Sequence, residues 1–555
     1  MTSNESPPAA WRRFIRALVA ALPRFLPALV TVFFFYSPQL AALGSVRNRY
    51  FLFWSGVDTL AVCTAILLLS LFAVTLGILI DRSSSPALKA LRDSLFLLFF
   101  GIGILVNALP LLHVQPVVEI LKRNRQSATL VLYLASAVFS VIWVVSIATW
   151  RPALVRVARA TCIILSPLVA IVLVPAFFWP SWSIRPNRIP VAVADRAGTP
   201  VYFLVFDEWS FTRSTTGDDF LAEFPHLRQL RSQSFFFTHA LSPAATTYKS
   251  LPEMMFQTSD YESLPQVFIR EPGEQGKPPA QFITPAASPG KAPPSLFTLA
   301  REQDYATCLI GFYLPYPRML GGDLSYSRVY SDYPRGRSFL DKMRLASIDN
   351  PQYWRVPFIT ALWKHLYAGV FSRHWWDLTE QMREDLNAAI AAPPQRKFVF
   401  AHLPVPHAPF IFKPDGSYRG AFPIRSGAGE DIDADIMGGT PAEYHDSLEH
   451  LDTFVGGIVA SLERAGSLDG ALLIVTSDHS WRIDPEHSAI ANSDALRHVP
   501  LLIKVPGQRR PVTIDAPMEA VNLKPLIEAG FRGELTDENA EALLAALAVS
   551  PADKP

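Results

Sequence analysis

The stretch Val201-Tyr202-Phe203-Leu204-Val205-Phe206-Asp207-Glu208 decides the fold of the larger part of the chain. Its apolar run ends abruptly in two carboxylates. A short continuous apolar run is typical of a strand that is buried on both faces of a parallel sheet. In such sheets ligands bind beyond the carboxyl ends of the strands. Asp207 and Glu208 are therefore candidate site residues.

Further apolar runs downstream continue this pattern and alternate with helical segments. We predict strands at 306–312, 397–403, 471–476 and 499–505. We predict helices at 295–303, 444–466 and 536–548; the second has one apolar stripe and ends at Gly466. Strands that alternate with helices predict an α/β domain with a mostly parallel central sheet flanked by helices, in the alkaline-phosphatase manner.

The first 180 residues have a different composition. Charged residues make up 18% of the 555-residue chain, against about 25% in ordinary soluble proteins. Residues 1–180 hold 15 Lys and Arg but 5 Asp and Glu, whereas the remainder holds 35 and 44. This division predicts a membrane domain followed by an acidic soluble part. We do not expect nucleic-acid binding, because the soluble part is acidic and shows no basic stripe.

Five apolar runs in this part predict a transmembrane bundle. They lie at 25–44, 57–80, 94–113, 128–149 and 160–179. Each is close to the roughly 20 residues that cross a bilayer. One such run alone is more typical of a buried core helix, but five runs separated by short basic loops indicate membrane spans. The predicted domains are a five-helix transmembrane domain (1–180), a linker (181–200), a catalytic domain (201–515) and a helical tail (516–555).

The distribution of Lys and Arg predicts the orientation. The N-terminal segment and the second and fourth loops hold ten of them, and the first and third loops hold five. The positive-inside rule therefore predicts a cytoplasmic N-terminus. An odd number of spans then places the soluble part outside.

Polar residues follow two further strands of the predicted sheet. His402 and His407 come after the run that begins at Lys397, and Asp478 and His479 come after 471–476. Singly, an Asp-Glu pair is typical of a solvated turn and Asp-His of a helix N-cap. Jointly they would meet at one edge of the sheet and form a nitrogen and oxygen site for Zn²⁺ or a similar divalent ion.

A hydroxyl-rich loop precedes the segment Leu251-Pro252. Thr247 in this loop is a candidate nucleophile, because a nearby metal ion would lower the pKa of its hydroxyl. The alternative is a helix N-cap, which the spacing alone favours.

Taken together, these motifs resemble the alkaline-phosphatase/sulfatase superfamily. They are 201–210, Thr247-x-x-Ser250-Leu251-Pro252-x-Met254, His402-x-x-x-x-His407-x-Pro409 and Val475-Thr476-Ser477-Asp478-His479, in that order. With the five-span anchor, the chain is most similar to the membrane-anchored branch that contains lipid A phosphoethanolamine transferases and lipoteichoic acid synthases.

This resemblance implies roles for the residues of each motif. Thr247 matches the nucleophile, and His402 and His407 match two histidines near the substrate phosphate or a second metal. The implied metal ligands are Glu208, Asp207, Thr247, Asp478, His479 and His487, with His498 as the alternative to His487. Zn²⁺ is the expected ion, with Mn²⁺ or Mg²⁺ as alternatives. Ser480 stands where a glycine usually follows Asp-His, Asp207 replaces a glycine, and the family's flanking cysteines are absent.

The resemblance implies metal-dependent transfer of a phosphoryl group from a phospholipid head group to a cell-envelope glycan or lipid acceptor, through a phospho-threonine. It further implies a multi-pass protein of the bacterial plasma membrane with a periplasmic or extracellular catalytic domain. The alternatives are a phosphate-ester hydrolase with the same site and a catalytically silent envelope-assembly scaffold. Sulfatase activity is not expected, because sulfatases mature a Cys or Ser to formylglycine and Thr247 cannot form that aldehyde.

Overall fold

The computed structural model describes most of the chain. The described residues are 9–44, 56–111, 125–178, 198–260, 263–264, 293–332, 334, 336, 338–354, 357–393, 396–424, 438–484 and 494–548. The predicted linker at 181–200 lies outside them except for its last three residues. The chain forms two compact units: 1–183 with 335–367 and 427–430, and 184–334 with 368–426 and 431–555. A segment from the middle of the soluble region thus belongs to the unit of the N-terminal helices.

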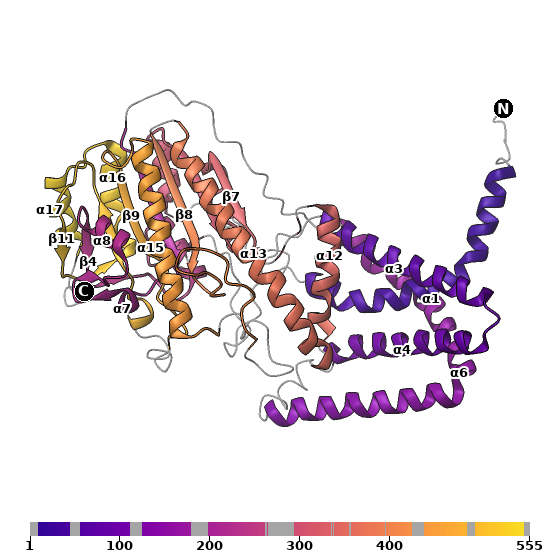
Figure 1. Cartoon of the computed structure of the whole chain (residues 1–555). Helices are drawn as coiled ribbons and strands as arrows, with labels where there is room; N and C mark the ends of the chain where they lie inside the picture. Colours follow the sequence, from indigo (N-terminus) through magenta and orange to yellow (C-terminus); the bar gives the residue numbers. More distant parts are fainter. Residues whose placement is uncertain are drawn as a thin grey trace, which may run out of the picture. The chain divides into compact units, whose positions relative to one another are not determined.

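The first unit contains four apolar helices that are long enough to cross a membrane (Figure 1). They are α1 (Ala9–Gly44), α3 (Gly56–Arg82), α4 (Pro86–Leu111) and α6 (Arg125–Phe178). The predicted fourth and fifth spans both lie in α6, which consists of two helices joined directly at a kink. The kink is at Trp150 (φ −122°, ψ 21°), two residues before Pro152, as is usual for proline-induced kinks.

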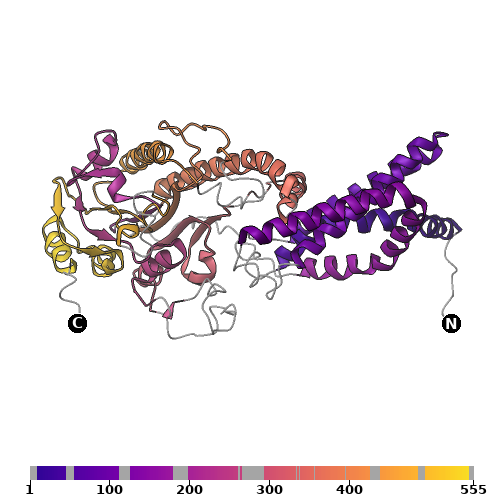
Figure 2. The same ribbon diagram turned by 90° about the horizontal axis from the view of Figure 1, so that it is seen from below.

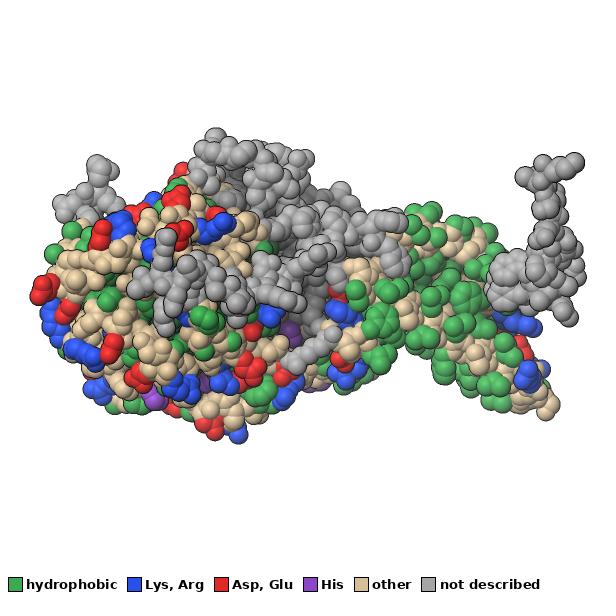
Figure 3. Space-filling view, turned by 90° about the horizontal axis from the view of Figure 1, so that it is seen from above, with side chains coloured by type: hydrophobic (Ala, Val, Ile, Leu, Met, Phe, Trp, Pro, Cys, Tyr) green, Lys and Arg blue, Asp and Glu red, His purple; other side chains and the backbone are tan. Residues whose placement is uncertain are grey.

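Apolar side chains cover the outer surface of these helices (Figure 3). Phe72 is 67% exposed and Ile164 is 75% exposed. Water would disfavour such a surface, whereas the hydrocarbon of a bilayer accommodates it. The surface indicates that the protein is anchored in a membrane.

The second unit is built on a sheet of eight described strands in the order β11-β4-β10-β9-β1-β8-β6-β7. The bounds are β1 (Val201–Asp207), β4 (Phe235–Phe237), β6 (Ala306–Phe312), β7 (Tyr326–Tyr330), β8 (Lys397–Pro406), β9 (Leu472–Ser477), β10 (Leu501–Lys504) and β11 (Val512–Ile514). Within this sheet β10 pairs antiparallel with β4 and β9, and the other pairs are parallel. The predicted mostly parallel sheet is confirmed.

The central strand β1 is buried along its whole length. It lies between β8 and β9, and Val205 is level with His402 on one side and Thr476 on the other. Across the β1–β8 pair, the rings of Phe203 and Phe400 lie 5.2 Å apart. This register brings the carboxyl ends of three strands to one edge of the sheet.

Helices cover both faces of this sheet (Figure 2). The helix α15 (Pro441–Arg464) packs on β8, while α10 (Leu296–Glu302) contacts β6 and α16 (Lys524–Arg532) contacts β1. The remaining helices are α7 (Phe211–Ser214), α8 (Pro225–Arg231), α9 (Thr247–Phe256), α11 (Tyr316–Leu320), α12 (Phe339–Asp349), α13 (Pro357–Ala391) and α17 (Asp537–Leu547). The helix predicted from Tyr444 starts earlier, because Thr440 and Glu443 form a capping box at its N-terminus.

Glu253 gives the fold a pH-dependent contribution to stability. This residue of α9 is 7% exposed, and burial raises its pKa to about 7, against the opposing effect of Arg497 and Lys249. A Glu side chain in the unfolded chain has a pKa of about 4.3. The folded state therefore holds a proton that the unfolded state loses between these two pH values. Stability from this group is present below about pH 4.3 and is lost as the pH rises through about 7.

We predict that Glu253→Gln removes this loss. The Tm of the Glu253→Gln protein, minus that of the natural protein, should increase between pH 5 and pH 8, because glutamine does not ionise. The measurement is thermal unfolding of the full chain in detergent, with the exposed Glu463→Gln as the control. Tm differences that stay constant with pH for both variants would show that Glu253 does not act in this way.

Candidate active site and metal centre

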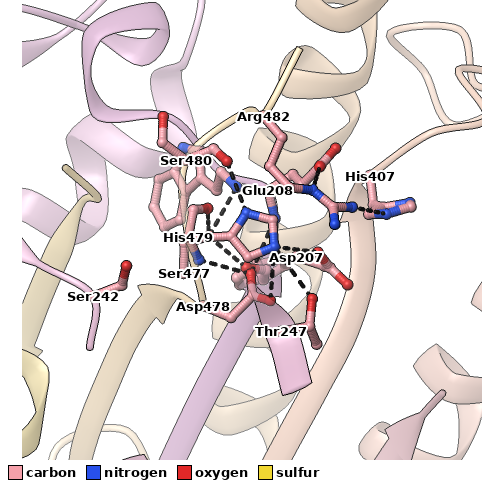
Figure 4. A network of polar contacts seen from close by, with 12 residues as sticks. Asp207, Glu208, Ser242, Thr247, His407, Ser477, Asp478, His479, Ser480 and Arg482 are labelled. Carbon is pink, nitrogen blue, oxygen red and sulfur yellow. Dashed lines mark hydrogen bonds and ion pairs between the residues drawn. The ribbon is translucent and has the colours of Figure 1, made fainter. Parts of the chain in front are cut away.

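Four buried side chains converge at the carboxyl edge of the sheet (Figure 4). Asp207 ends β1, Thr247 is the first residue of α9, and Asp478 and His479 follow β9. Figure 4 shows the side chains of Asp207, Thr247 and Asp478 directed toward His479. The structure thus brings together residues that are up to 272 positions apart, from Asp207 to His479.

Asp207, His402 and Asp478 form a potential metal site. One ligand atom of each residue lies within 4.8 Å of the others, and His402 Nε2 is 3.3 Å from Asp207 Oδ2. Asp207 Oδ1, Asp478 Oδ2 and His402 Nε2 are buried and have no hydrogen-bond partner among the described residues. Buried polar atoms normally have a partner. A divalent ion would satisfy all three, and this donor set fits Zn²⁺ or another divalent ion.

The ring of His402 is held by its surroundings. The strand β8 runs to Pro406, beyond the predicted end at residue 403, so His402 lies well inside the strand. Its Nδ1 is 2.8 Å from the Tyr316 hydroxyl, and its ring stacks on Phe312 with 4.4 Å between centroids. These contacts direct Nε2 toward Asp207, as outer partners commonly orient a metal-binding histidine.

Thr247 and His479 form a nucleophile and base pair. The distance from Thr247 Oγ1 to His479 Nε2 is 3.2 Å. His479 Nδ1 is 2.8 Å from the carbonyl oxygen of Ser480. A carbonyl oxygen only accepts, so Nδ1 carries a proton in this contact, and Nε2 is the ring atom that faces the Thr247 hydroxyl. This arrangement is typical of an activated hydroxyl nucleophile.

Glu208 forms an ion pair with Arg482. Arg482 Nε donates to Glu208 Oε1 at 2.6 Å, and Arg482 Nη2 lies 3.1 Å from His407 Nε2. The Glu208 backbone has φ 65°, a left-handed conformation that costs a non-glycine residue about 1 kcal/mol, and its N–H donates to Asp478 Oδ1 at 3.2 Å. Asp207, predicted as a possible second ligand, belongs to the group of Asp207, His402 and Asp478, whereas Glu208, the predicted main carboxylate, does not. Glu208 Oε2 has no partner in the described part of the chain.

The carboxylates differ in their ease of ionisation. Burial alone would raise the pKa of Asp207, but the charges of His407, His402 and His479 together lower this pKa below its usual range. Arg482 lowers the pKa of Glu208 in the same way, against the effect of burial. Burial and the neighbouring Asp207 charge raise the pKa of Asp478. A cation bound at the site would stabilise the ionised form of Asp478.

The other predicted histidines have separate environments. His487 lies outside the described residues. His498 Nε2 is 2.8 Å from the Thr238 carbonyl oxygen, and its ring stacks on Phe211 at 4.2 Å, so these contacts lie apart from the metal cluster. His407 connects to the cluster through Arg482, because its Nδ1 donates to the Ala408 carbonyl oxygen and its Nε2 accepts from the guanidinium.

Sequence reasoning missed Arg482 and Tyr316. Arg482 had a usable signal, since a cation three residues after the Asp478-His479 pair lies close to a group of carboxylates. Tyr316 had none, because its contact with His402 depends on the neighbouring placement of α11 and β8.

Comparisons with known proteins identify the family of the chain. The family model "Sulfatase" matches residues 200–527, which is more than half of the chain. The iduronate 2-sulfatase of Homo sapiens is 31% identical over 87 residues, 15% of this chain and 15% of that protein. That of Mus musculus is 32% identical over 71 residues, 12% and 13% of the two chains. The chain thus matches a small part of the length of these relatives.

Among solved structures, the phosphonate monoester hydrolase of Agrobacterium radiobacter is similar at 18% identity and a TM-score of 0.37, covering 62% of this chain and 74% of that one. A protein in the alkaline phosphatase superfamily from Vibrio parahaemolyticus is similar at 14% identity and a TM-score of 0.33, covering 61% and 67%. The family match over 200–527 carries the assignment. The chain belongs to the Sulfatase family, within the alkaline-phosphatase/sulfatase superfamily that its motifs resemble.

Proposed function

We propose that the protein transfers a phosphoryl-containing head group from a phospholipid to a cell-envelope glycan or lipid acceptor, through a phospho-Thr247 intermediate. The observation that carries this proposal is the buried Thr247 hydroxyl, 3.2 Å from His479 Nε2 and beside a potential metal site. Sulfate-ester hydrolysis is not proposed, because a threonine cannot become the formylglycine that sulfatases use.

Asp207, His402 and Asp478 would hold the divalent ion, with Thr247 and His479 next to it. We expect Zn²⁺, with Mn²⁺ or Mg²⁺ as alternatives, because the donor set mixes imidazole nitrogen with carboxylate oxygen. When bound, such an ion lowers the pKa of a nearby hydroxyl and offsets negative charge on phosphoryl oxygens. The two roles suit the first half of a phosphoryl transfer.

The residues of the chain supply the proton transfers. His479 Nε2 accepts the Thr247 proton while Oγ1 bonds to phosphorus, and the bond from phosphorus to the lipid alcohol breaks. The alcohol leaves with a proton from an imidazole, and His407 is the alternative to His479 for this role, because His402 would hold the ion. In the second half, the acceptor hydroxyl bonds to phosphorus and gives up its proton, and the Thr247 oxygen leaves and regains one.

The N-terminus of α9 and Arg482 stabilise negative charge at the site. Thr247 occupies the first turn of a ten-residue helix, where free backbone N–H groups and the helix dipole favour an anion. Arg482 is held by Glu208 and touches His407, so its guanidinium is fixed near the reacting group. Such pre-positioned charge is a large part of phosphoryl-transfer catalysis.

Packing within the first unit supports an exoplasmic catalytic domain. Residues of α12, which follow the last span in the chain, contact the bundle where α1 ends and α3 begins. Ser347 Oγ lies 2.8 Å from the Tyr36 hydroxyl, and Lys342 Nζ lies 2.6 Å from Asp58 Oδ1. The chain leaves this end along α3 and returns along α4, so α6 would cross twice, bending at Trp150. Five crossings, together with the arginine-rich N-terminal segment, would put the catalytic domain outside the cytoplasm.

We predict that a phospholipid labelled with ³²P in its head group will label Thr247. Purified full-length protein is incubated with labelled phosphatidylethanolamine or phosphatidylglycerol and Zn²⁺ or Mn²⁺, and the labelled residue is identified. Thr247→Ala and metal chelation should each abolish the label. Thr246→Ala should retain it, because this neighbouring hydroxyl makes no cap hydrogen bond to α9 in the described structure.

The same reaction separates the alternatives. Label that moves from Thr247 to an added glycan or lipid acceptor supports transfer. Free labelled head group with no labelled acceptor would support a hydrolase, in which water replaces the acceptor. A protein that binds no metal and takes no label would contradict the proposal and favour a scaffold.

We predict that Arg482→Lys lowers kcat/KM about 10- to 100-fold, because a lysine cannot contact Glu208 and His407 at once and one charge-assisted hydrogen bond is lost. The measurement is steady-state turnover of the labelled lipid, together with the metal content of the protein. Arg509→Lys is the matched control, since Arg509 pairs with Asp469 on the exposed surface. Equal turnover by the two variants would exclude Arg482 from the site.

A further inference from the structure

Exposed large apolar side chains outside the four N-terminal helices are confined, among the described residues, to one region. They are Phe339 (36% exposed), Leu340 (72%), Leu362 (60%) and Leu366 (66%). All four belong to α12 and the beginning of α13, within the unit of the N-terminal helices. A soluble protein surface rarely groups such residues without a partner. We therefore expect another molecule to cover these side chains.

The helix α12 is fixed to the helical bundle by polar contacts. Lys342 pairs with Asp58 of α3, whose side chain is 8% exposed. Ala346 is buried, and its carbonyl oxygen accepts from Gln39 Nε2 at 3.3 Å. Just after α12, Trp354 Nε1 donates to the Phe35 carbonyl oxygen at 2.7 Å. These contacts hold α12 against the bundle, and Leu340 stays 72% exposed in this position.

The apolar surface is continuous with that of a membrane helix. Val57 (50% exposed) and Leu60 (46% exposed) flank Asp58 at the beginning of α3, the part of α3 that pairs with α12. The exposed apolar surface therefore runs from α3 onto α12. Because α3 is one of the four candidate spans, its beginning marks the boundary between the hydrocarbon and the head groups. The exposed apolar surface therefore lies at this boundary.

The pattern of residues on α12 and α13 suits the interface of a bilayer. Leu362 and Leu366 are four positions apart, so they lie on one side of α13, with the exposed His365 beside them. On α12, the exposed Arg344 follows Leu340 by one turn. Apolar side chains next to basic ones are typical of helices that lie at the head groups, where the apolar part enters the acyl boundary and the cation meets phosphate.

We propose that Phe339, Leu340, Leu362 and Leu366 form a lipid-contacting surface that enters the head-group region of the bilayer. The segment from α12 to the beginning of α13 would then lie on the membrane surface, next to the beginning of α3. The occupant is phospholipid. This inference concerns contact with lipid and does not depend on the chemistry of Thr247.

The test places a fluorophore at single introduced cysteines. Leu340→Cys and Leu366→Cys are labelled with an environment-sensitive dye in the full chain in phosphatidylethanolamine/phosphatidylglycerol nanodiscs. The natural Cys63, Cys162 and Cys308 are buried, and the unmodified protein measures their background. Ala545→Cys, at an exposed position of α17, is the matched control. Each label is quenched in turn by lipids with a nitroxide near the head group and by aqueous iodide.

We expect nitroxide lipids to quench the labels at 340 and 366 at least about threefold more than the label at 545, because interfacial side chains enter the head-group and acyl boundary. Iodide should show the opposite order. If the label at 340 or 366 responds like that at 545, the lipid surface is excluded. Protection from both quenchers that grows with the number of chains per disc would instead identify a second copy as the occupant and overturn the proposal. Because quenching does not require turnover, its result is independent of whether Thr247 is labelled.

Discussion

The parallel pairing of β1 with β8 and β9 forces like charges together at one edge of the sheet. Asp207 and Asp478 are both carboxylates, and both are buried. Two such groups in a low-dielectric environment repel each other and lose their hydration. The neighbouring His402 and the Arg482 guanidinium reduce this cost, and a bound divalent ion would reduce it further. Much of the arrangement around the sheet edge can be understood as compensation for the charge that the register concentrates there.

The fold was predictable where burial leaves a strong pattern in the sequence. The strands β1, β6, β8 and β9 are long apolar runs because helices cover both of their faces, and their positions agree with the predictions. The strands β4 and β11 have three residues each, too few for any period to show. The long helix α13 escaped prediction because it belongs first to one compact unit and then to the other, so no single apolar stripe runs along it.

The candidate site was predictable as a set of residue types but not as a set of contacts. Strand ends identified Asp207, His402, Asp478 and His479, because the register of a parallel sheet follows from its topology. The direction of each side chain does not follow from the topology. The left-handed backbone of Glu208 and its pairing with Arg482 depend on three-dimensional packing. For the same reason the resemblance implied Glu208 as the main metal carboxylate, whereas Asp207 is the carboxylate that lies beside His402 and Asp478.

The backbone hydrogen bond of His479 changes the meaning of an unusual residue. Position 480 holds serine where related enzymes usually have glycine, a difference that by itself suggests decay of an active site. Yet the group that positions the imidazole is the main-chain oxygen of Ser480, which every amino acid possesses. Genetic drift at this codon therefore leaves the tautomer of the base untouched. The serine at position 480 is therefore no argument by itself against a working site in this chain.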